Sequence, residues 1–473
     1  MDSSTKARAL GVVLTSCLGA SLLNAQTFLQ PPERVTTIPY EDARPILDAL
    51  REDLLPAELR SRTPAEREAL WPAWVARRDG EIRDRLAQAD EDSVLNLLLL
   101  GTRFTTRPRV TDLASLRAPA TAADLVGGRL DDLIASLGSP QADERLRFAR
   151  EVIALRGIDL ETPQGRRQAQ EHLLAILARV IAETEGFVRT VEAIAGLEDP
   201  HAKLSLNATL YRDRGLSSDT SVVSNFALDQ AFQELKAAGT LKPGAVRRVA
   251  IVGPGLDIVD KREGHDFYPV QTMQPFGVAD SLTRLGLAAS DLRVTTFDLS
   301  PRVNDHLAGA RQRARAGTAY LLHLPLGAHE RWRPELVSYW ERFGSSVGEE
   351  TQPAASPVGA GVRVRAIHVR PATVAAIVPQ DLNIVVQRLD PIAPGHRFDL
   401  VIETNVLVYY DLFDQSLAAA NVAQMLRPGG LLLSNTLIVE LPRSPLGLVG
   451  YTDVVYTESA VGDRILWYGR VSS

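Results

Sequence analysis

Apolar and polar residues alternate along the first part of the chain with the period of an α-helix. In EHLLAILARVIAETEGFVRTVEAI (171–194), one helical stripe is apolar and the opposite face carries acids and an arginine. The stripe consists of Leu173, Leu177, Val180, Ile181, Val188 and Val191. Thr162 followed by Pro163 fits a helix N-cap. The pattern predicts an all-helical domain over residues 26–204.

From about residue 245 the pattern changes to short β-branched runs that alternate with helices, which is typical of a parallel sheet. The helices are expected over 301–316 and 411–426, the second stopped by Pro428-Gly429-Gly430. Two final runs, YTDVVYTES and RILWYGRV, predict an antiparallel hairpin. The expected buried strands are 246–253, 292–300, 382–388, 398–403 and 431–436.

This order of elements resembles the class I S-adenosylmethionine (SAM)-dependent methyltransferases, in which the last strand inserts antiparallel. The most specific part is FDLVIETNVLVYYDLFDQSLAAANVAQMLRPGGLLLSN, where strand, helix, Pro-Gly-Gly turn and strand follow the family's order. The resemblance implies an α/β fold with a Rossmann-like methyltransferase sheet over residues 205–473, including a flexible loop at 345–361.

The first strand ends in a glycine-containing bend, Gly253-Pro254-Gly255, followed by Asp257. Glycine lets a ligand approach the backbone closely at the carboxyl end of a strand. In the methyltransferase family a G-x-G-x-G loop at this point holds the methionine half of SAM, and Asp257 stands here in place of the third glycine. The alternative is a tight turn with no ligand.

Asp298 ends the second strand and Leu299 follows it. A carboxylate at this position can accept hydrogen bonds from both ribose hydroxyls of an adenosine. It would lie beside the glycine bend, because adjacent parallel strands end at one edge of the sheet. The alternative is an aspartate that caps the helix beginning at Pro301.

Two further segments resemble the chemotaxis-receptor glutamate O-methyltransferases: LNATLYRDRG (206–215) and RLDPIAPGHRFDLVIETNVLVYYD (388–411). The resemblance places Arg212 at the SAM carboxylate and Leu389 near the adenine. It places Asn405 and Tyr409 at the methyl-transfer pocket, as the candidate catalytic residues. An exposed surface position is the other interpretation of Arg212.

The loop after the glycine bend departs from that family, and Thr404 replaces an arginine that precedes the family's asparagine. His265 and Asp266 in this loop are candidate bases for a hydroxyl or amine acceptor. Phe267-Tyr268-Pro269 is a candidate lid.

The N-terminus has the order of a bacterial secretory signal: Lys6 and Arg8, a short apolar core, and small residues around Ala25. We therefore expect residues 1–25 to be a signal peptide and the protein to be exported. Cys17, the only cysteine, follows a loose lipoprotein-type sequence and is a candidate for lipid anchoring. If the segment is not a signal, the protein stays in the cytoplasm.

The chain carries a net charge of −6 over 473 residues and no block of Lys and Arg. This balance predicts no dedicated surface for nucleic acids or for anionic membranes, and no later apolar run reaches the ~20 residues of a membrane helix. Without HExxH or CxxC, no metal site is expected. The expected function is methyl transfer from SAM to a small-molecule or protein acceptor. The alternatives are an exported, non-catalytic protein with a degenerate methyltransferase fold and a nicotinamide oxidoreductase, which Ile258 disfavours.

Overall fold

The computed structural model describes residues 34–111, 119–139, 143–212, 214–216, 220–259, 265–327, 331–355 and 362–471. The expected signal peptide and Cys17 lie outside the described residues. Residues 33–473 form one compact unit by their internal contacts. The predicted domain boundary at residue 204 remains a prediction.

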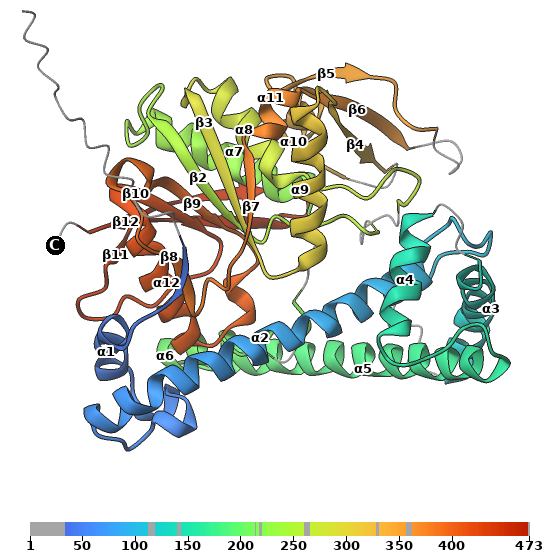
Figure 1. Cartoon of the computed structure of the whole chain (residues 1–473), viewed down its shortest axis with the longest axis horizontal. Coiled ribbons are helices and arrows are strands. Elements are labelled where there is room, and N and C mark those ends of the chain that lie inside the picture. The colour runs from blue at the N-terminus through green and yellow to red at the C-terminus, as the bar shows by residue number, and fades with distance from the viewer. Residues whose placement is uncertain are drawn as a thin grey trace, which may run out of the picture. The chain divides into compact units, whose positions relative to one another are not determined.

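The first part of this unit is mainly helical (Figure 1). The longest helix, α2, begins with a complete capping box, in which Thr63 and Glu66 exchange hydrogen bonds between side chain and backbone. Helix α5 begins as predicted, because the Thr162 side chain accepts a hydrogen bond from the Gly165 backbone N–H at 2.9 Å. The elements are β1 (Val35–Thr37), α1 (Tyr40–Ala49), η1 (Glu52–Leu54), η2 (Ala57–Leu59), α2 (Pro64–Leu100), α3 (Pro119–Leu137), α4 (Glu144–Ala154), α5 (Pro163–Gly196) and α6 (Pro200–Asn207).

The predicted apolar stripe of α5 is buried only over its first half. Leu173 and Leu177 are buried, whereas Val188 and Val191 are 43% and 41% exposed. The helical period was therefore predicted correctly, but the far end of the stripe is not covered by the core.

A seven-stranded sheet forms the centre of the second part, in the order β11-β12-β10-β9-β2-β3-β7. Neighbouring strands from β10 to β7 are parallel, whereas β12 is antiparallel to both of its neighbours. The last strand is thus inserted antiparallel between β10 and β11. This confirms the expected fold class, a Rossmann-like class I methyltransferase sheet that ends in an antiparallel hairpin. The strands are β2 (Val246–Val252), β3 (Ala288–Asp298), β7 (Ile377–Asp381), β9 (Phe398–Glu403), β10 (Leu426–Ser434), β11 (Leu446–Val455) and β12 (Gly462–Arg470).

Helices cover both faces of this sheet, and side chains of β2 alternate between the two cores. Val249 and Ile251 belong to the core that contains α7 and α8, whereas Ala250 and Val252 belong to the core that contains α12. The second core also takes in Trp74 of α2, whose ring lies 5.4 Å from that of Phe413. The first half of α2 therefore shares a core with the sheet, whereas the second half of α2 packs with α3, α4 and α5 in a core of its own. The remaining helices are α7 (Val222–Ala237), α8 (Gln274–Arg284), α9 (Pro301–Arg315), α10 (Pro334–Arg342), α11 (Pro371–Ala375), η4 (Pro394–His396), η5 (Leu407–Tyr409) and α12 (Leu412–Met425).

The strand predicted over residues 382–388 is not part of the sheet. Its apolar residues are buried, but Asn383 accepts a hydrogen bond from the Gln387 backbone N–H at 2.7 Å and closes a turn. The third parallel strand is instead β7, which contains Pro379. Because β7 is an edge strand, it tolerates a proline. Pro379 interrupts the pattern expected of a strand, so β7 was not predicted from the sequence. Residues Gln387–Leu389 form the short strand β8, which pairs with β1.

A second, three-stranded sheet lies between α9 and β7 in the chain. It has the order β4-β6-β5, with β4 (Tyr320–Leu326), β5 (Gly348–Thr351) and β6 (Arg363–Val369). Strand β5 falls within the segment expected to be a flexible loop (345–361), of which 356–361 lie outside the described residues. No helix in the described ranges is long and apolar enough to cross a membrane.

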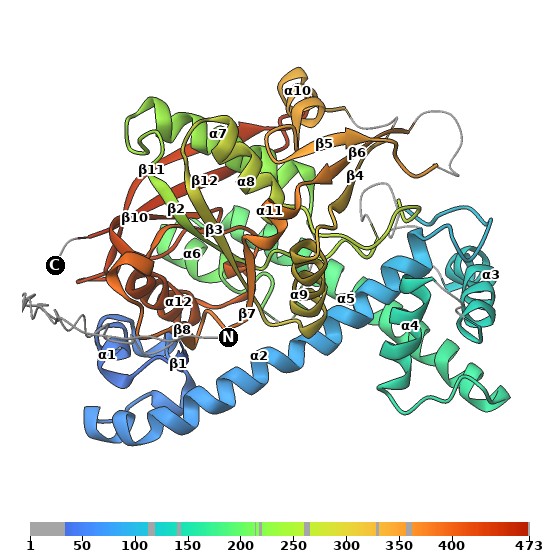
Figure 2. The same ribbon diagram turned by 45° about the horizontal axis from the view of Figure 1, so that its top comes forward.

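Helix α2 lies beneath the carboxyl ends of the parallel strands, as both ribbon views show (Figures 1 and 2). Arg83 of α2 forms an ion pair with Asp381, the last residue of β7, at 2.9 Å. Arg78 of α2 forms an ion pair with Asp414 at the start of α12. The helical part is thereby fixed against the edge of the sheet at which ligands bind in this fold class.

Candidate functional site

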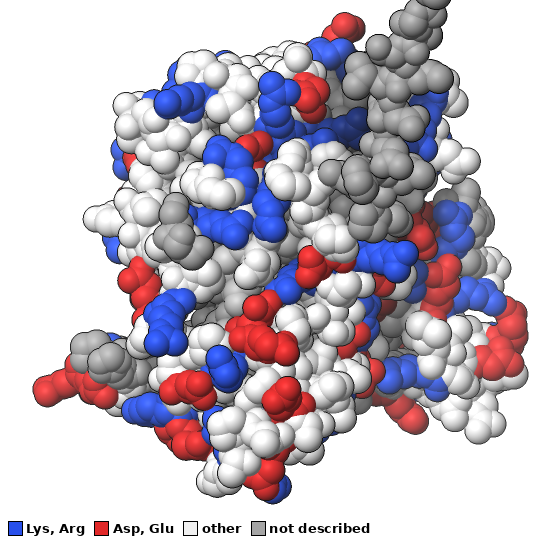
Figure 3. Space-filling model, turned by 60° about the vertical axis from the view of Figure 1, so that its left-hand side comes forward, with Lys and Arg blue, Asp and Glu red and all other residues white. Residues whose placement is uncertain are grey.

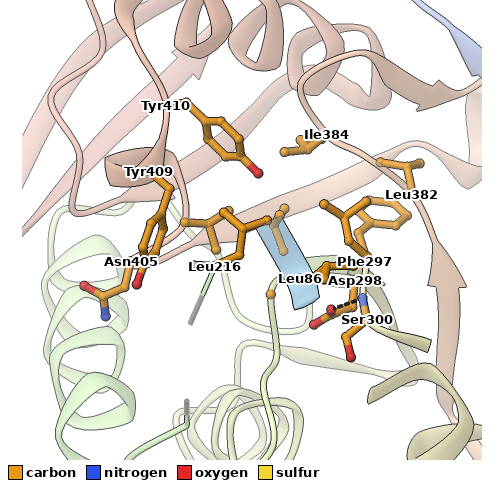
Figure 4. Close-up of a pocket in the computed structure, with 14 residues that line it drawn as sticks. Leu86, Leu216, Phe297, Asp298, Ser300, Leu382, Ile384, Asn405, Tyr409 and Tyr410 are labelled. Carbon is orange, nitrogen blue, oxygen red and sulfur yellow. Dashed lines mark hydrogen bonds between the residues drawn. The ribbon is translucent and has the colours of Figure 1, made fainter. Parts of the chain in front are cut away.

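The carboxyl edge of the sheet holds a pocket with an empty volume of about 550 Å³ (Figure 4). We call it the edge pocket. It lies at the ends of β2 and β3 and the start of the segment after β9, and α2 forms one wall. This volume includes space that is open to solvent, so it is not that of an enclosed cavity. The lining residues are Leu86, Leu216, Val252, Gly253, Phe297, Asp298, Leu299, Ser300, Leu382, Ile384, Asn405, Val406, Tyr409 and Tyr410.

The glycine bend after β2 forms as predicted. Gly253 and Gly255 have φ angles of 67° and 70°, a region that side chains other than glycine rarely adopt. A Cβ atom on Gly253 would lie 2.6 Å from Cγ2 of Val406. Pro254 is buried, and its carbonyl accepts a hydrogen bond from the Thr272 hydroxyl at 3.2 Å. The absence of a side chain at 253 therefore lets the bend pack against the loop after β9.

Asp298 lines the edge pocket and contacts the bend directly. Its carboxylate accepts hydrogen bonds from the backbone N–H of Ser300, at 2.8 Å, and from that of Gly255. The pKa of Asp298 is raised to about 7, mainly by burial and in part by the nearby Asp381, while these hydrogen bonds oppose the rise. The carboxylate and the bend thus meet at one edge of the sheet, as the sequence predicted.

Asn405 and Tyr409 line the opposite side of the edge pocket (Figure 4). Asn405 has a φ of 60° and is held by Asn435, which donates to its side-chain oxygen at 2.7 Å. The Asn435 side-chain oxygen in turn accepts from the Asn405 backbone N–H at 2.8 Å. The Tyr409 ring packs edge-on against that of Tyr211, with 5.7 Å between centroids. Both candidate catalytic residues are therefore fixed at the pocket.

Other candidates lie outside the edge pocket. Arg212 is exposed in a turn after α6. Leu389 is buried in β8 opposite Val35, and its backbone N–H points at the Met425 sulfur, so it packs in the core. The position of Leu389 gives no support to its predicted place beside an adenine.

Asp257, at the third glycine position, is also buried away from the pocket lining. The Tyr268 hydroxyl donates to its carboxylate at 2.6 Å, and its backbone pairs with Gln271. The loop therefore folds back on itself at the point where the family has glycine.

The inserted loop that was expected to carry a base and a lid is a packed part of the structure. The Asp266 carboxylate accepts hydrogen bonds from the Thr102 backbone N–H at 2.8 Å and hydroxyl at 2.6 Å. His265, Phe267 and Tyr268 are all buried. These residues hold the loop against the end of α2 and do not line the edge pocket.

Several lining residues were missed by sequence reasoning. Leu86 belongs to a helix far away in the chain, so no local pattern connects it to the glycine bend. Leu382 and Ile384 were assigned to a strand, whereas the structure places them in the loop after β7. Arg85, next to Leu86, donates to the backbone carbonyls of Tyr211, Arg214 and Tyr409, each at 3.0 Å. It thereby joins three segments around the pocket.

No protein-family model and no curated protein sequence matches the chain. Among solved structures, it is similar to the N-methyltransferase NodS from Bradyrhizobium japonicum WM9 in complex with S-adenosyl-L-homocysteine (SAH), at 14% identity and a TM-score of 0.26, over 60% of this chain and 99% of that one. It is also similar to the glycopeptide N-methyltransferase MtfA complexed with SAM, at 13% identity and a TM-score of 0.25, over 59% of this chain and 99% of that one. A third similar structure is human N-acetylserotonin methyltransferase in complex with SAM, at 14% identity and a TM-score of 0.23, over 87% of this chain and 99% of that one.

Proposed function

We propose that the protein is a SAM-dependent methyltransferase that binds its cofactor in the edge pocket. The observation that supports this most is the contact between the Asp298 carboxylate and the Gly255 backbone N–H at the rim of an otherwise largely apolar cavity. An adenosine offers ribose hydroxyls to the carboxylate and an apolar base face to Leu299, Leu382 and Ile384.

In this reaction, a lone pair of the acceptor forms a bond to the methyl carbon while the carbon–sulfur bond breaks. The sulfur keeps the electron pair and SAH is released. Asn405 and Tyr409, which lie across the pocket from Asp298, are proposed to border the acceptor. The protein's contribution is alignment of donor and acceptor in a cavity that excludes water. The acceptor is proposed to be a small molecule or a protein.

Thermal unfolding of the full chain tests cofactor binding. SAM or SAH at ~100 times its dissociation constant is expected to add ~2.7 kcal/mol to the free energy of unfolding. NAD at the same concentration is expected to give no shift. A shift with NAD alone would contradict the proposal.

A non-catalytic adenosyl-binding protein is the second candidate, and Asp257 favours it. This residue replaces the third glycine and is bonded to Tyr268, away from the pocket lining. Under this alternative the chain binds SAH as expected but transfers no labelled methyl group from SAM to any acceptor in extracts of its own cell. Export, which would separate the chain from cytosolic SAM, is proposed together with this alternative and is tested by fusing residues 1–30 to a reporter.

A larger side chain on α2 that fills the edge pocket is expected to prevent cofactor binding without changing any residue of the sheet. Leu86→Trp places a larger ring in the pocket wall, so SAH affinity measured by calorimetry is expected to fall at least ~10-fold. Leu86→Ala is the matched control, because it enlarges the pocket and is expected to keep binding within ~3-fold. Equal affinities for wild type and Leu86→Trp would mean that the cofactor binds elsewhere.

A further inference from the structure

The edge of the sheet opposite the edge pocket is rich in Lys and Arg. At this edge, which we call the amino edge, β2, β3, β9 and β10 begin and β12 ends. The chain has a net charge of −6, so a basic edge means that the fold separates charges that are mixed in the sequence. Figure 3 shows Lys and Arg gathered, with few acidic residues, over the upper part of the face that it displays.

Like charges lie next to each other at the middle and at one end of the amino edge. Arg248 of β2 is directly opposite Arg293 of β3. Arg293 and Arg315 each lie close to Arg311 of α9: burial lowers the pKa of Arg311, and the positive charges of Arg315 and Arg293 lower it further. Like charges placed directly opposite in a sheet are destabilising. Among the described residues, Arg293 and Arg315 have no carboxylate within ion-pair distance.

The same arrangement recurs at the hairpin end of the amino edge. Arg397 donates a hydrogen bond to the Gln424 carbonyl, and Arg470 donates to the Leu426 carbonyl. Burial lowers the pKa of Arg470 and the positive charge of Arg397 lowers it further. Both guanidinium groups thus bond to neutral carbonyls and keep their full positive charge.

Three acids offset part of this charge, one of which is Glu440, whose carboxylate accepts a hydrogen bond from the Leu448 backbone N–H at 2.5 Å. Asp291 forms an ion pair with Arg247 at 2.7 Å, and Asp399 forms one with Arg427. Lys242, in the loop before β2, adds another exposed cation. The remaining cations need an anionic partner outside the chain if they are to be neutralised.

Exposed aliphatic side chains lie beside the basic residues at the hairpin end. Leu448, Val449 and Val471 are 43%, 59% and 53% exposed. Val471 directly follows Arg470 in the chain. Leu448 and Val449 belong to β11, whose first residue, Leu446, pairs with Arg470. Cations alone suit any polyanion, whereas cations flanked by exposed aliphatic groups suit a surface with both phosphates and hydrocarbon.

We propose that the amino edge binds the surface of membranes that contain anionic phospholipids. The arginines and Lys242 contact the lipid phosphates, and Leu448, Val449 and Val471 enter the region just below the headgroups. The edge pocket then faces away from the lipid, because it lies at the opposite edge of the sheet. This proposal does not depend on the proposed methyl transfer.

Cosedimentation of the full chain with vesicles tests the proposal. Binding to phosphatidylglycerol-containing vesicles is expected, with at least ~10-fold weaker binding to pure phosphatidylcholine and loss of binding when NaCl rises from ~0.05 M to ~0.5 M. No binding to the anionic vesicles would overturn the proposal.

Two variants and one control locate the contact. The triple variant Lys242→Glu, Arg293→Glu and Arg315→Glu is expected to lower vesicle affinity at least ~10-fold. The control Arg147→Glu, Arg167→Glu and Arg189→Glu changes the charge equally at exposed positions of α4 and α5 and is expected to bind like wild type. Equal losses in the two triples, or none in the first, would contradict a contact at the amino edge. Circular dichroism of both triples confirms that each is folded.

The aliphatic residues separate lipid from other polyanions. Val449→Ser with Val471→Ser is expected to weaken vesicle binding several-fold and to leave binding to heparin unchanged. If duplex DNA binds more tightly than the vesicles and the serine substitutions have no effect on vesicle binding, the partner is a nucleic acid and the lipid proposal is wrong.

Discussion

Asp298→Asn is expected to abolish measurable SAM and SAH binding. In the proposed cofactor complex the carboxylate accepts two ribose hydroxyls, and each hydrogen bond to a charged group contributes about 1.5–3 kcal/mol. Losing both charge-assisted bonds lowers the affinity by at least ~100-fold, which calorimetry detects directly. Asp305→Asn, an exposed carboxyl on α9, is the matched control and is expected to bind normally.

The same substitution is expected to stabilise the protein without ligand. The pKa of Asp298 is raised to about 7, above the ~3.9 of an unfolded chain. The folded state then holds its proton more tightly, so this carboxyl reduces stability as the pH rises from about 4 through 7. Urea unfolding without ligand measures this effect. The free energy of unfolding of Asp298→Asn is expected to be higher than that of the wild type, and the difference is expected to be larger at about pH 8 than at about pH 5.

Cofactor affinity is expected to follow the same ionisation. Hydroxyl donors favour the ionised carboxylate, so SAH binding to the wild type becomes tighter between about pH 6 and 8 and releases a proton. A pH-independent affinity, or full binding by Asp298→Asn, would mean that another group holds the ribose and would remove the main support for the proposed function.

The parts of the fold that could be predicted are those in which local pattern and core packing agree. Strand β2 was found because its apolar run ends at Gly253, strand β9 because its run FDLVIE is largely apolar, and helix α12 because Asp411 caps it. Strand β7 was missed because Pro379 interrupts it, and an edge position removes the penalty that would normally exclude proline.

The site residues that could be predicted are those that lie at the end of a strand. Gly253 and Asp298 follow from the rule that adjacent parallel strands end at one edge. Leu86 could not be found in this way, because only tertiary packing brings α2 to that edge. Leu389 was assigned through a resemblance alone, and the pairing of β8 with β1, which no local pattern indicates, places it in the core.

The charge of the amino edge was hidden for a related reason. Its cations come from strands, connecting segments and helix α9, which are far apart in the chain, so no long basic block stands out in the sequence. Net charge describes the whole surface and says nothing about how a fold distributes its signs.

Arg78→Met is expected to lower the free energy of unfolding by about 3–5 kcal/mol, because it leaves the buried Asp414 carboxylate without its partner. Arg78 contacts Asp414 with both Nε and Nη2, and the Asp414 side chain is only 2% exposed. Urea unfolding measures the loss. Arg77→Met is the matched control: Arg77 is 45% exposed and pairs with surface glutamates, so a loss below ~1 kcal/mol is expected.

The loss is expected to depend on pH in a defined direction. The pKa of Asp414 is raised to about 7, mainly by burial and in part by Asp411, while Arg78 opposes the rise. Without Arg78 the carboxyl takes up a proton at higher pH, so the deficit is largest above about pH 7 and shrinks towards pH 5. Because this pair joins α2 to α12, a deficit in one cooperative transition would mean that the helical part and the sheet unfold together. Two separate unfolding transitions, with only the first shifted by Arg78→Met, would instead show that α2 can leave the carboxyl edge while the sheet stays folded. The position of α2 over the edge pocket would then be reversible.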